Sequence, residues 1–158
     1  MTLLIADDEF IIRKGLMSLK WDTIGINEIL CAENGIEARK ILKENNIDIL
    51  ITDIKMPGLT GLELAEYIKS NSKNTRIVLL SGFSDFEYAR SAIRSNVIEY
   101  LLKPIKPNEL LKTVKLIVKE IEAINYKNKL INEFENMSLS MSLTEQILHS
   151  FRQSNDTV

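Results

Sequence analysis

Acidic side chains cluster directly after the first apolar run of the chain. Residues 3–10 spell LLIADDEF, so Asp7, Asp8 and Glu9 follow a stretch that has the pattern of a short buried strand. Like charges this close repel one another, and each disfavours the charged form of its neighbours. A folded protein that keeps these acids therefore needs something positive to place among them.

Three further residues with useful chemistry follow later apolar runs. Asp53 stands in ITDIKMPGLTG, Ser81 in LLSGFSD and Lys103 in YLLKPIKP. Clustered carboxylates favour a hard divalent cation such as Mg²⁺, which usually takes one or two carboxylates and retains waters. An aspartate beside such a metal can attack phosphorus and carry a phosphoryl group. The cation and Lys103 would neutralise the transferred oxygens, and Ser81 would donate a hydrogen bond to one of them.

Alternating strands and helices would bring these residues together. Apolar runs predict strands at residues 2–6, 26–32, 47–52, 76–81 and 97–103. Amphipathic spacing predicts helices at residues 10–19, 35–46, 60–71 and 85–96, and a last helix after PIKPNE. This alternation indicates an α/β fold with a doubly wound, five-stranded parallel sheet. The carboxyl ends of its strands share one edge, where such sheets bind their ligands.

Composition and the rare residue types narrow the function further. Net charge is −2, so this segment has no basic excess for binding nucleic acid. The single Cys31, in the apolar stretch EILCA, excludes an internal disulfide and fits a reducing compartment, the cytoplasm; we expect it to be buried. Cys31 and the single His149 cannot form a zinc site of the usual kind. No apolar run approaches the ~20 residues of a membrane span, so we expect no membrane insertion.

The sequence resembles the receiver domain of two-component response regulators. The resemblance covers about residues 1–122 and consists of ADDE, ITDIKMPGLTG, LLSGFSDFEYAR and EYLLKPIKPNEL, in the order and spacing of the family. Within the family, IRKGLMSLKWDTIG and SGFSDFEYA are most similar to receivers of regulators with an AraC-type DNA-binding domain. The resemblance implies a flavodoxin-like (βα)5 receiver that takes a phosphoryl group from a sensor histidine kinase and regulates transcription.

The resemblance also assigns the residues of the metal and phosphate site. Asp53 matches the phosphate-accepting aspartate, Asp8 the direct metal ligand, and Asp7 the acid that holds the metal, often through water. The backbone carbonyl of Lys55 should complete the protein's share of the Mg²⁺ coordination. Lys103 matches the phosphate-pairing lysine.

Other positions match residues that act in the family's phosphorylation switch or influence how long the phosphoryl group persists. Ser81 matches the switch hydroxyl and Tyr100 the switch aromatic. The bond between Lys103 and Pro104 is usually cis in the family, which is far easier before proline than elsewhere. Phe83, like Lys55, matches a position that borders the phosphoryl group and influences its hydrolysis, although both could equally be solvated loop side chains.

The sequence argues against two classes of enzyme and leaves one alternative open. A nucleotide-binding α/β enzyme needs a Gly-rich loop after the first strand, and ADDEFIIRKG has none. A haloacid-dehalogenase-like phosphatase needs two aspartates two residues apart at that place, which ADDEF does not supply. A stand-alone or phosphorylation-independent receiver that acts as a protein-interaction module remains the alternative. In the favoured interpretation, the chain catalyses only its own phosphorylation and dephosphorylation.

The residues beyond the receiver predict a helical linker or tail. Residues 123–158 do not resemble a helix-turn-helix unit, so we expect an output domain that binds DNA to be absent from this chain. The chain would then be a fragment of a longer transcription factor, or else a stand-alone receiver with a tail.

The last helix has the four-three spacing of a coiled-coil seam. The series is Leu110, Val114, Ile117, Ile121, Ile124, Asn128 and Ile131. We expect its first part to cover the sheet, and Ile124 and Ile131 to be exposed on a helix that pairs in parallel with a second copy as a homodimer. The alternative is a helix that folds back or frays after Lys127.

Overall fold

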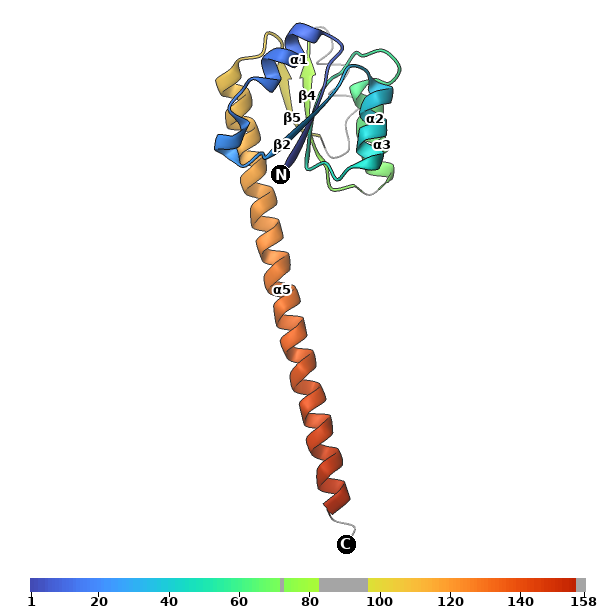
Figure 1. Ribbon diagram of the computed structural model, residues 1–158, viewed down its shortest axis with the longest axis vertical. Coiled ribbons are helices and arrows are strands. Elements are labelled where there is room, and N and C mark those ends of the chain that lie inside the picture. Colours follow the sequence, from blue (N-terminus) through green and yellow to red (C-terminus); the bar gives the residue numbers. More distant parts are fainter. Residues whose placement is uncertain (72, 83–96, 156–158) are drawn as a thin grey trace. The chain divides into compact units, whose positions relative to one another are not determined.

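A five-stranded parallel sheet forms the centre of the computed structural model, which describes residues 1–71, 73–82 and 97–155 (Figure 1). Its strands are β1 (Thr2–Ala6), β2 (Glu28–Ala32), β3 (Ile49–Asp53), β4 (Arg76–Ser81) and β5 (Val97–Leu102). Their order across the sheet is β2-β1-β3-β4-β5, and each neighbouring pair is parallel. The predicted fold is therefore confirmed, and the four strands that end in the candidate residues are adjacent.

Short amphipathic helices connect the strands. They are α1 (Phe10–Met17), the 3-10 helix η1 (Trp21–Ile24), α2 (Gly35–Glu44) and α3 (Gly61–Ser70). Side-chain caps begin two of them: Asn34 accepts a hydrogen bond from the Glu37 amide at 2.8 Å, and Thr60 and Glu63 form a capping box. Such caps satisfy amide groups that the first helical turn leaves without partners. The helix predicted for residues 85–96 lies outside the described residues.

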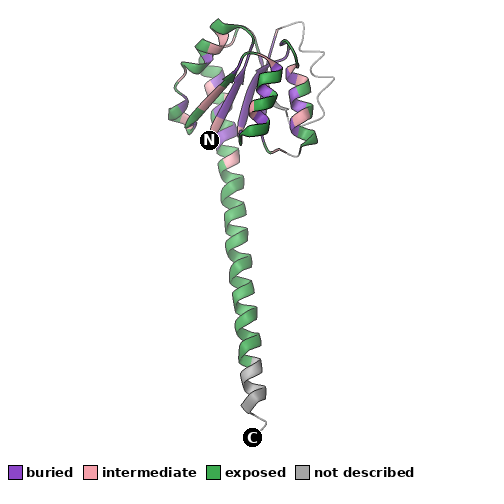
Figure 2. Cartoon of the chain, turned by 45° about the vertical axis from the view of Figure 1, so that its right-hand side comes forward, coloured by how far each residue is buried: buried purple, intermediate pink, exposed green. Residues whose placement is uncertain are grey.

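The core lies against the inner strands of the sheet (Figure 2). All five residues of β3 and the last four of β1 are buried, as expected for strands covered on both faces. By contrast, β2 is an edge strand, and Cys31 within it is exposed. The expectation that Cys31 is buried was wrong because an apolar run does not reveal which strand will stand at the edge.

Helix α5 (Pro107–Asn155) contributes to both compact units of the chain, Met1–Val118 and Lys119–Val158. In the first unit, Leu110, Val114 and Ile117 are buried, which confirms that the early part of the spaced series is core. In the second unit, Ile124 and Ile131 are 41% and 44% exposed, also as expected. The helix continues past Lys127 without interruption. The domain boundary near residue 122 stays a prediction.

None of the described helices carries an apolar segment long enough to cross a membrane.

Candidate metal and phosphoacceptor site

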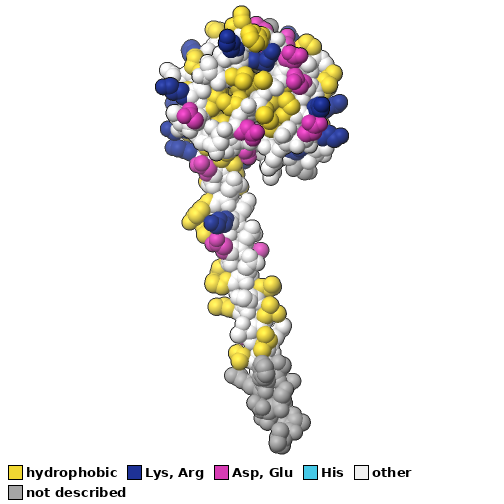
Figure 3. Space-filling model, in the orientation of Figure 1, with side chains coloured by type: hydrophobic (Ala, Val, Ile, Leu, Met, Phe, Trp, Pro, Cys, Tyr) yellow, Lys and Arg dark blue, Asp and Glu magenta, His cyan; other side chains and the backbone are white. Residues whose placement is uncertain are grey.

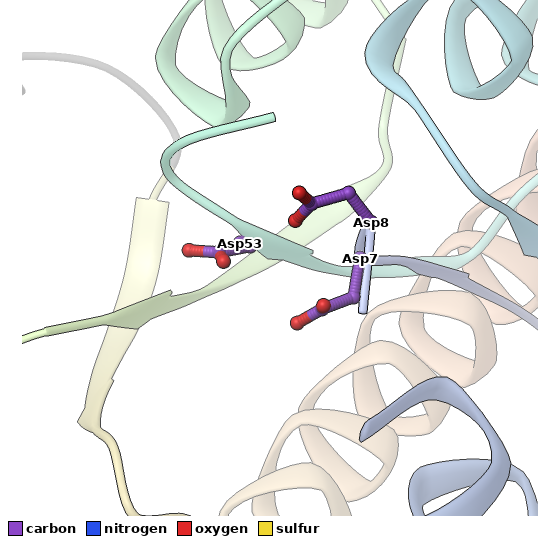
Figure 4. Close-up of side chains that lie close together, drawn as sticks. All are labelled: Asp7, Asp8 and Asp53. Carbon is purple, nitrogen blue, oxygen red and sulfur yellow. The ribbon is translucent and has the colours of Figure 1, made fainter. Parts of the chain in front are cut away.

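Three carboxylates meet at the carboxyl edge of the sheet (Figure 4). Ala6 stands opposite Thr52 in the parallel ladder of β1 and β3, so the next residues, Asp7 and Asp53, become neighbours. Asp8 adds a third carboxylate, and oxygens of the three side chains all lie within 4.8 Å of one another. Asp7 is 0% and Asp53 9% exposed, while Asp8 faces solvent.

This group of donors fits a magnesium ion. All three side chains offer carboxylate oxygens, the hard donors that Mg²⁺ prefers, and the exposed side of Asp8 leaves room for the waters that this ion retains. The Lys55 amide lies 3.4 Å from Asp53 Oδ1, which keeps the backbone of Lys55 beside the cluster. The structure thus brings together the four residues that the sequence analysis assigned to the metal.

Lys103 places a positive charge among the acids. Its Nζ donates to Asp53 Oδ2 at 2.7 Å and to Asp7 Oδ2 at 3.2 Å, and it lies 3.6 Å from Glu9 Oε1. The Lys103 amide donates to the Ser81 carbonyl at 2.8 Å, which ties the residue to the end of β4. The peptide bond between Lys103 and Pro104 is cis, as the resemblance implied. Lys103, which follows β5, therefore relieves part of the repulsion that the sequence predicted among the acids.

Burial and neighbouring charges shift the pKa values of Asp7 and Lys103. Burial raises the pKa of Asp7 above its ordinary value, and the Glu9 amide and Lys103 offset this effect only in part. Burial alone would lower the pKa of Lys103, but the hydrogen bond and charge of Asp53, together with those of Asp7, outweigh it and raise that pKa. Lys103 is therefore positively charged at neutral pH, as a phosphate-pairing residue must be.

The two switch candidates lie on the neighbouring strands β4 and β5. Ser81 ends β4, one residue beyond Leu80, which stands opposite Asp53. Its side chain is buried, and Oγ donates to the Gly82 carbonyl at 2.8 Å. Tyr100 stands opposite Leu79 and packs its partly buried ring against the core, where burial raises the pKa of its hydroxyl.

Arg13, which was not predicted as a site residue, holds the backbone of the acidic loop. Its Nη1 donates to the backbone carbonyls of Asp7 at 2.7 Å and Asp8 at 3.1 Å. Its guanidinium carbon lies 5.8 Å from the centre of the Phe10 ring, and Nη2 lies 3.9 Å from Glu33 Oε2. The sequence offers one indication of this contact, a basic residue in the helix that follows the acids. A long side chain on a helix points back towards the N-terminus of that helix, and so towards the acidic loop.

Glycines allow the turn after Asp53 to fold back against the end of β3. Gly58 has a φ of 83°, a conformation that disfavours a side chain. A Cβ at Gly61 would overlap the Asp53 carbonyl oxygen and crowd Thr52. These two positions let α3 begin directly behind the phosphoacceptor candidate.

The structure describes one of the two positions that were expected to border the phosphoryl group. Phe83 lies outside the described residues. Lys55 is exposed beside Asp53, and its effect on the phosphoryl lifetime stays a prediction.

Acids and a lysine at the carboxyl edge of a β2-β1-β3-β4-β5 parallel sheet define a receiver-type signalling domain of flavodoxin-like fold. Comparison with protein families leads to the same class. The sequence model described as "Response regulator receiver domain" matches residues 3–115, and the chain belongs to this family.

Relatives with transcriptional names are similar over most of this chain. The transcriptional regulatory protein YesN of Bacillus subtilis strain 168 is 38% identical over 121 residues, which are 76% of this chain and 33% of that protein. The transcriptional regulatory protein HptR of Staphylococcus aureus strain NCTC 8325 is 37% identical over 107 residues, 67% of this chain and 42% of that protein. The chain thus spans between a third and a half of these relatives.

Solved structures show the same fold. The REC domain of AraT, a response regulator from Geobacillus stearothermophilus, superposes with a TM-score of 0.74 at 34% identity, over 78% of this chain and 97% of that one. A two-component transcriptional regulator AraC from Clostridium phytofermentans ISDg gives a TM-score of 0.69 at 33% identity, over 75% and 93% of the two chains. The AraC-type branch noted from the sequence is therefore among the structural neighbours.

Proposed function

We propose that this receiver is controlled by phosphorylation and that Asp53 accepts the phosphoryl group from a phosphohistidine of a sensor histidine kinase. The observation that carries the proposal is the position of Asp53, with its Oδ2 2.7 Å from Lys103 Nζ and its carboxylate beside those of Asp7 and Asp8. A carboxylate oxygen of Asp53 attacks phosphorus and forms the new O–P bond. The P–N bond to the histidine breaks, and the ring nitrogen keeps the electron pair.

The residues around Asp53 would stabilise the transferred group. Lys103 already donates to Asp53 and would pair with the phosphoryl oxygens, whose negative charge is greater than that of the carboxylate. The Ser81 hydroxyl would give up its bond to the Gly82 carbonyl and donate to a phosphoryl oxygen instead. The movement of Ser81 and Tyr100 would carry the change to β5, at the edge of the sheet.

The acidic cluster would hold Mg²⁺ through Asp7, Asp8 and Asp53, with the Lys55 carbonyl as a further ligand. When bound, the ion supplies positive charge that neutralises the oxygens of the transferring phosphoryl group. Burial raises the pKa of Asp7 and Lys103 offsets this effect only in part, so a cation among the three carboxylates would stabilise the charged form of Asp7.

The phosphorylation signal would regulate transcription through a further domain. The relatives named above are called transcriptional regulatory proteins and are two to three times as long as the segment they share with this chain. We propose that a DNA-binding output domain is attached beyond the receiver, in the cytoplasm, and that phosphorylation changes its activity by strengthening a homodimer.

Intact mass spectrometry tests the proposal. Incubation with a small-molecule phosphodonor and Mg²⁺ should add about 80 Da to the native chain and nothing to Asp53→Asn. The matched control is Asp22→Asn, an exposed acid far from the cluster in sequence, which should be labelled like the native chain. Equal labelling of the Asp53→Asn variant would overturn the assignment.

A further inference from the structure

Helix α5 carries an unpartnered apolar stripe within the second unit, Lys119–Val158. The stripe consists of Leu130, Phe134, Met137, Met141 and Leu148, with Thr144 completing the series. Successive members are four, three, four, three and four residues apart, which is the spacing of a coiled-coil seam. The apolar members are between 47% and 68% exposed, and every residue from 122 to 148 is exposed (Figure 2). Figure 3 shows hydrophobic side chains along this part of α5.

This stripe is a different seam from the one expected from the sequence. Continued past Ile131, the expected series would place Glu135 and Ser138 at core positions, which are polar. The new stripe is displaced by one residue, about 100° around a helix of 3.6 residues per turn. Ile131 then flanks the seam, and Asn128 lies away from it.

We propose that a second copy of this chain covers the stripe, with the two α5 helices packed side by side as a coiled coil. The four-three spacing is the pattern that a helical partner accommodates, because in a coiled coil each seam residue fills a hole between four residues of a facing helix. Methionine, present twice in the seam, is flexible enough to pack against its own equivalent. The inference concerns this helix alone and does not depend on phosphoryl transfer to Asp53.

The charges beside the stripe fit an identical partner. Among its flanking positions up to Leu148, the charged residues are Glu133 and Glu145, and Glu133 lies 3.9 Å from Lys129 on its own helix. In a parallel pair, Glu133 would face Ser138 of the second copy and Glu145 would face Ser140, so no like charges oppose each other. A face with so little charge does not select a strongly basic or acidic partner.

The same charges argue against a lipid surface. Residues 119–148 contain five glutamates and three lysines, an acidic excess of two. Amphipathic helices that lie on anionic membranes carry lysine and arginine on their polar face instead. A second copy is therefore the occupant that the described residues favour.

Sedimentation velocity of the full chain tests the proposal over a concentration series without phosphodonor. The native chain should form a dimer, and Met137→Lys/Met141→Lys should weaken it by about 100-fold or more. The matched control is Leu139→Lys/Leu143→Lys, which adds the same charges to the same helix at residues that are 66% and 53% exposed but lie off the stripe. The control should dimerise like the native chain.

Two further variants keep the test decisive. Asn128→Lys should leave the dimer intact; dissociation of this variant would favour the seam through Asn128 over the one proposed. If circular dichroism shows that the lysine pair unwinds the helix, alanine at Met137 and Met141 repeats the test with the strongest helix former. A native chain that stays monomeric at about 100 µM, or equal loss in the stripe and control variants, would overturn the inference.

Discussion

Replacement of Lys103 by methionine should strongly destabilise the protein when no divalent cation is present. Lys103 Nζ lies 2.7 Å from Asp53 and 3.2 Å from Asp7, and its side chain is only 20% exposed. Without it, two buried carboxylates would face each other with no lysine between them. Removing one partner of a buried ion pair costs about 3–5 kcal/mol. We expect about 3 kcal/mol, the lower end of that range, because Lys103 retains some contact with water.

The repulsion between Asp7 and Asp53 predicts whether Asp53→Asn raises or lowers stability. Two unit charges 4.8 Å apart, the upper limit for these oxygens, repel by about 3.5 kcal/mol at an effective dielectric constant of 20. Asp53→Asn removes this repulsion from the Lys103→Met protein, so the double variant should be more stable than Lys103→Met by about 3.5 kcal/mol. In the native background, Asp53→Asn should instead reduce stability, because there it removes an ion pair.

Urea unfolding of the four proteins in excess chelator measures this coupling. The midpoints should shift while the slopes stay constant, since the same surface is exposed in each case. A loss of 3 kcal/mol also corresponds to a fall in Tm of about 6–12 °C for a chain of this size. Lys106→Met, an exposed lysine three residues away, is the matched control and should change stability by less than about 0.5 kcal/mol. A double variant no more stable than Lys103→Met would refute the electrostatic account.

Three other predictions follow from the site and its surroundings. Mg²⁺ at 100 times its dissociation constant should stabilise the native chain by about 2.7 kcal/mol, seen as a rise in Tm that Asp8→Ala loses; an unchanged rise in that variant would count against the metal site. Arg13→Met should weaken the Mg²⁺ response by loosening the loop that carries the acids, whereas Arg13→Lys should retain part of it; equal responses in all three proteins would remove Arg13 from the site. Thr60→Ala should lower stability by about 1 kcal/mol through loss of the capping box. The Thr60 amide and, to a smaller extent, its hydroxyl lower the pKa of Glu63, and the variant keeps the amide. The hydroxyl's share of this stabilisation should therefore be present above pH 4.5 and fade as the pH falls through the lowered pKa; a difference between variant and native chain that does not shrink at low pH would contradict it.

The meeting of these acids and the lysine at one edge of the sheet could be predicted because the strand ends can be located from local patterns. Runs buried on both faces are apolar at nearly every position, so their last residues are easily found. Once the strands pair in parallel, the residues after them meet at one edge, and this is how Asp7, Asp53 and Lys103 come together. The strand order, which left β2 and Cys31 at the edge, depends on interactions between distant segments and could not be obtained this way.

Features that depend on how side chains pack escaped prediction. Arg13 donates to backbone carbonyls, and such a hydrogen bond cannot be predicted from the spacing of residue types. The long helix posed a different problem, because four-three spacing occurs twice in it, one residue out of phase. The sequence predicted the series through Ile124 and Asn128, which stays a prediction, whereas we propose the stripe through Phe134 and Met137; members of both series are exposed.

Location of the phosphoryl group on the chain tests the central claim most directly. After treatment with a phosphodonor and Mg²⁺, borohydride reduction of the acyl phosphate would mark the modified side chain, and tandem mass spectrometry of the peptides would identify it. The account predicts that the mark falls on Asp53 and leaves Asp7 and Asp8 unmodified. A mark on either of those two residues, or on none of the three in a chain that gained the phosphoryl mass, would contradict it.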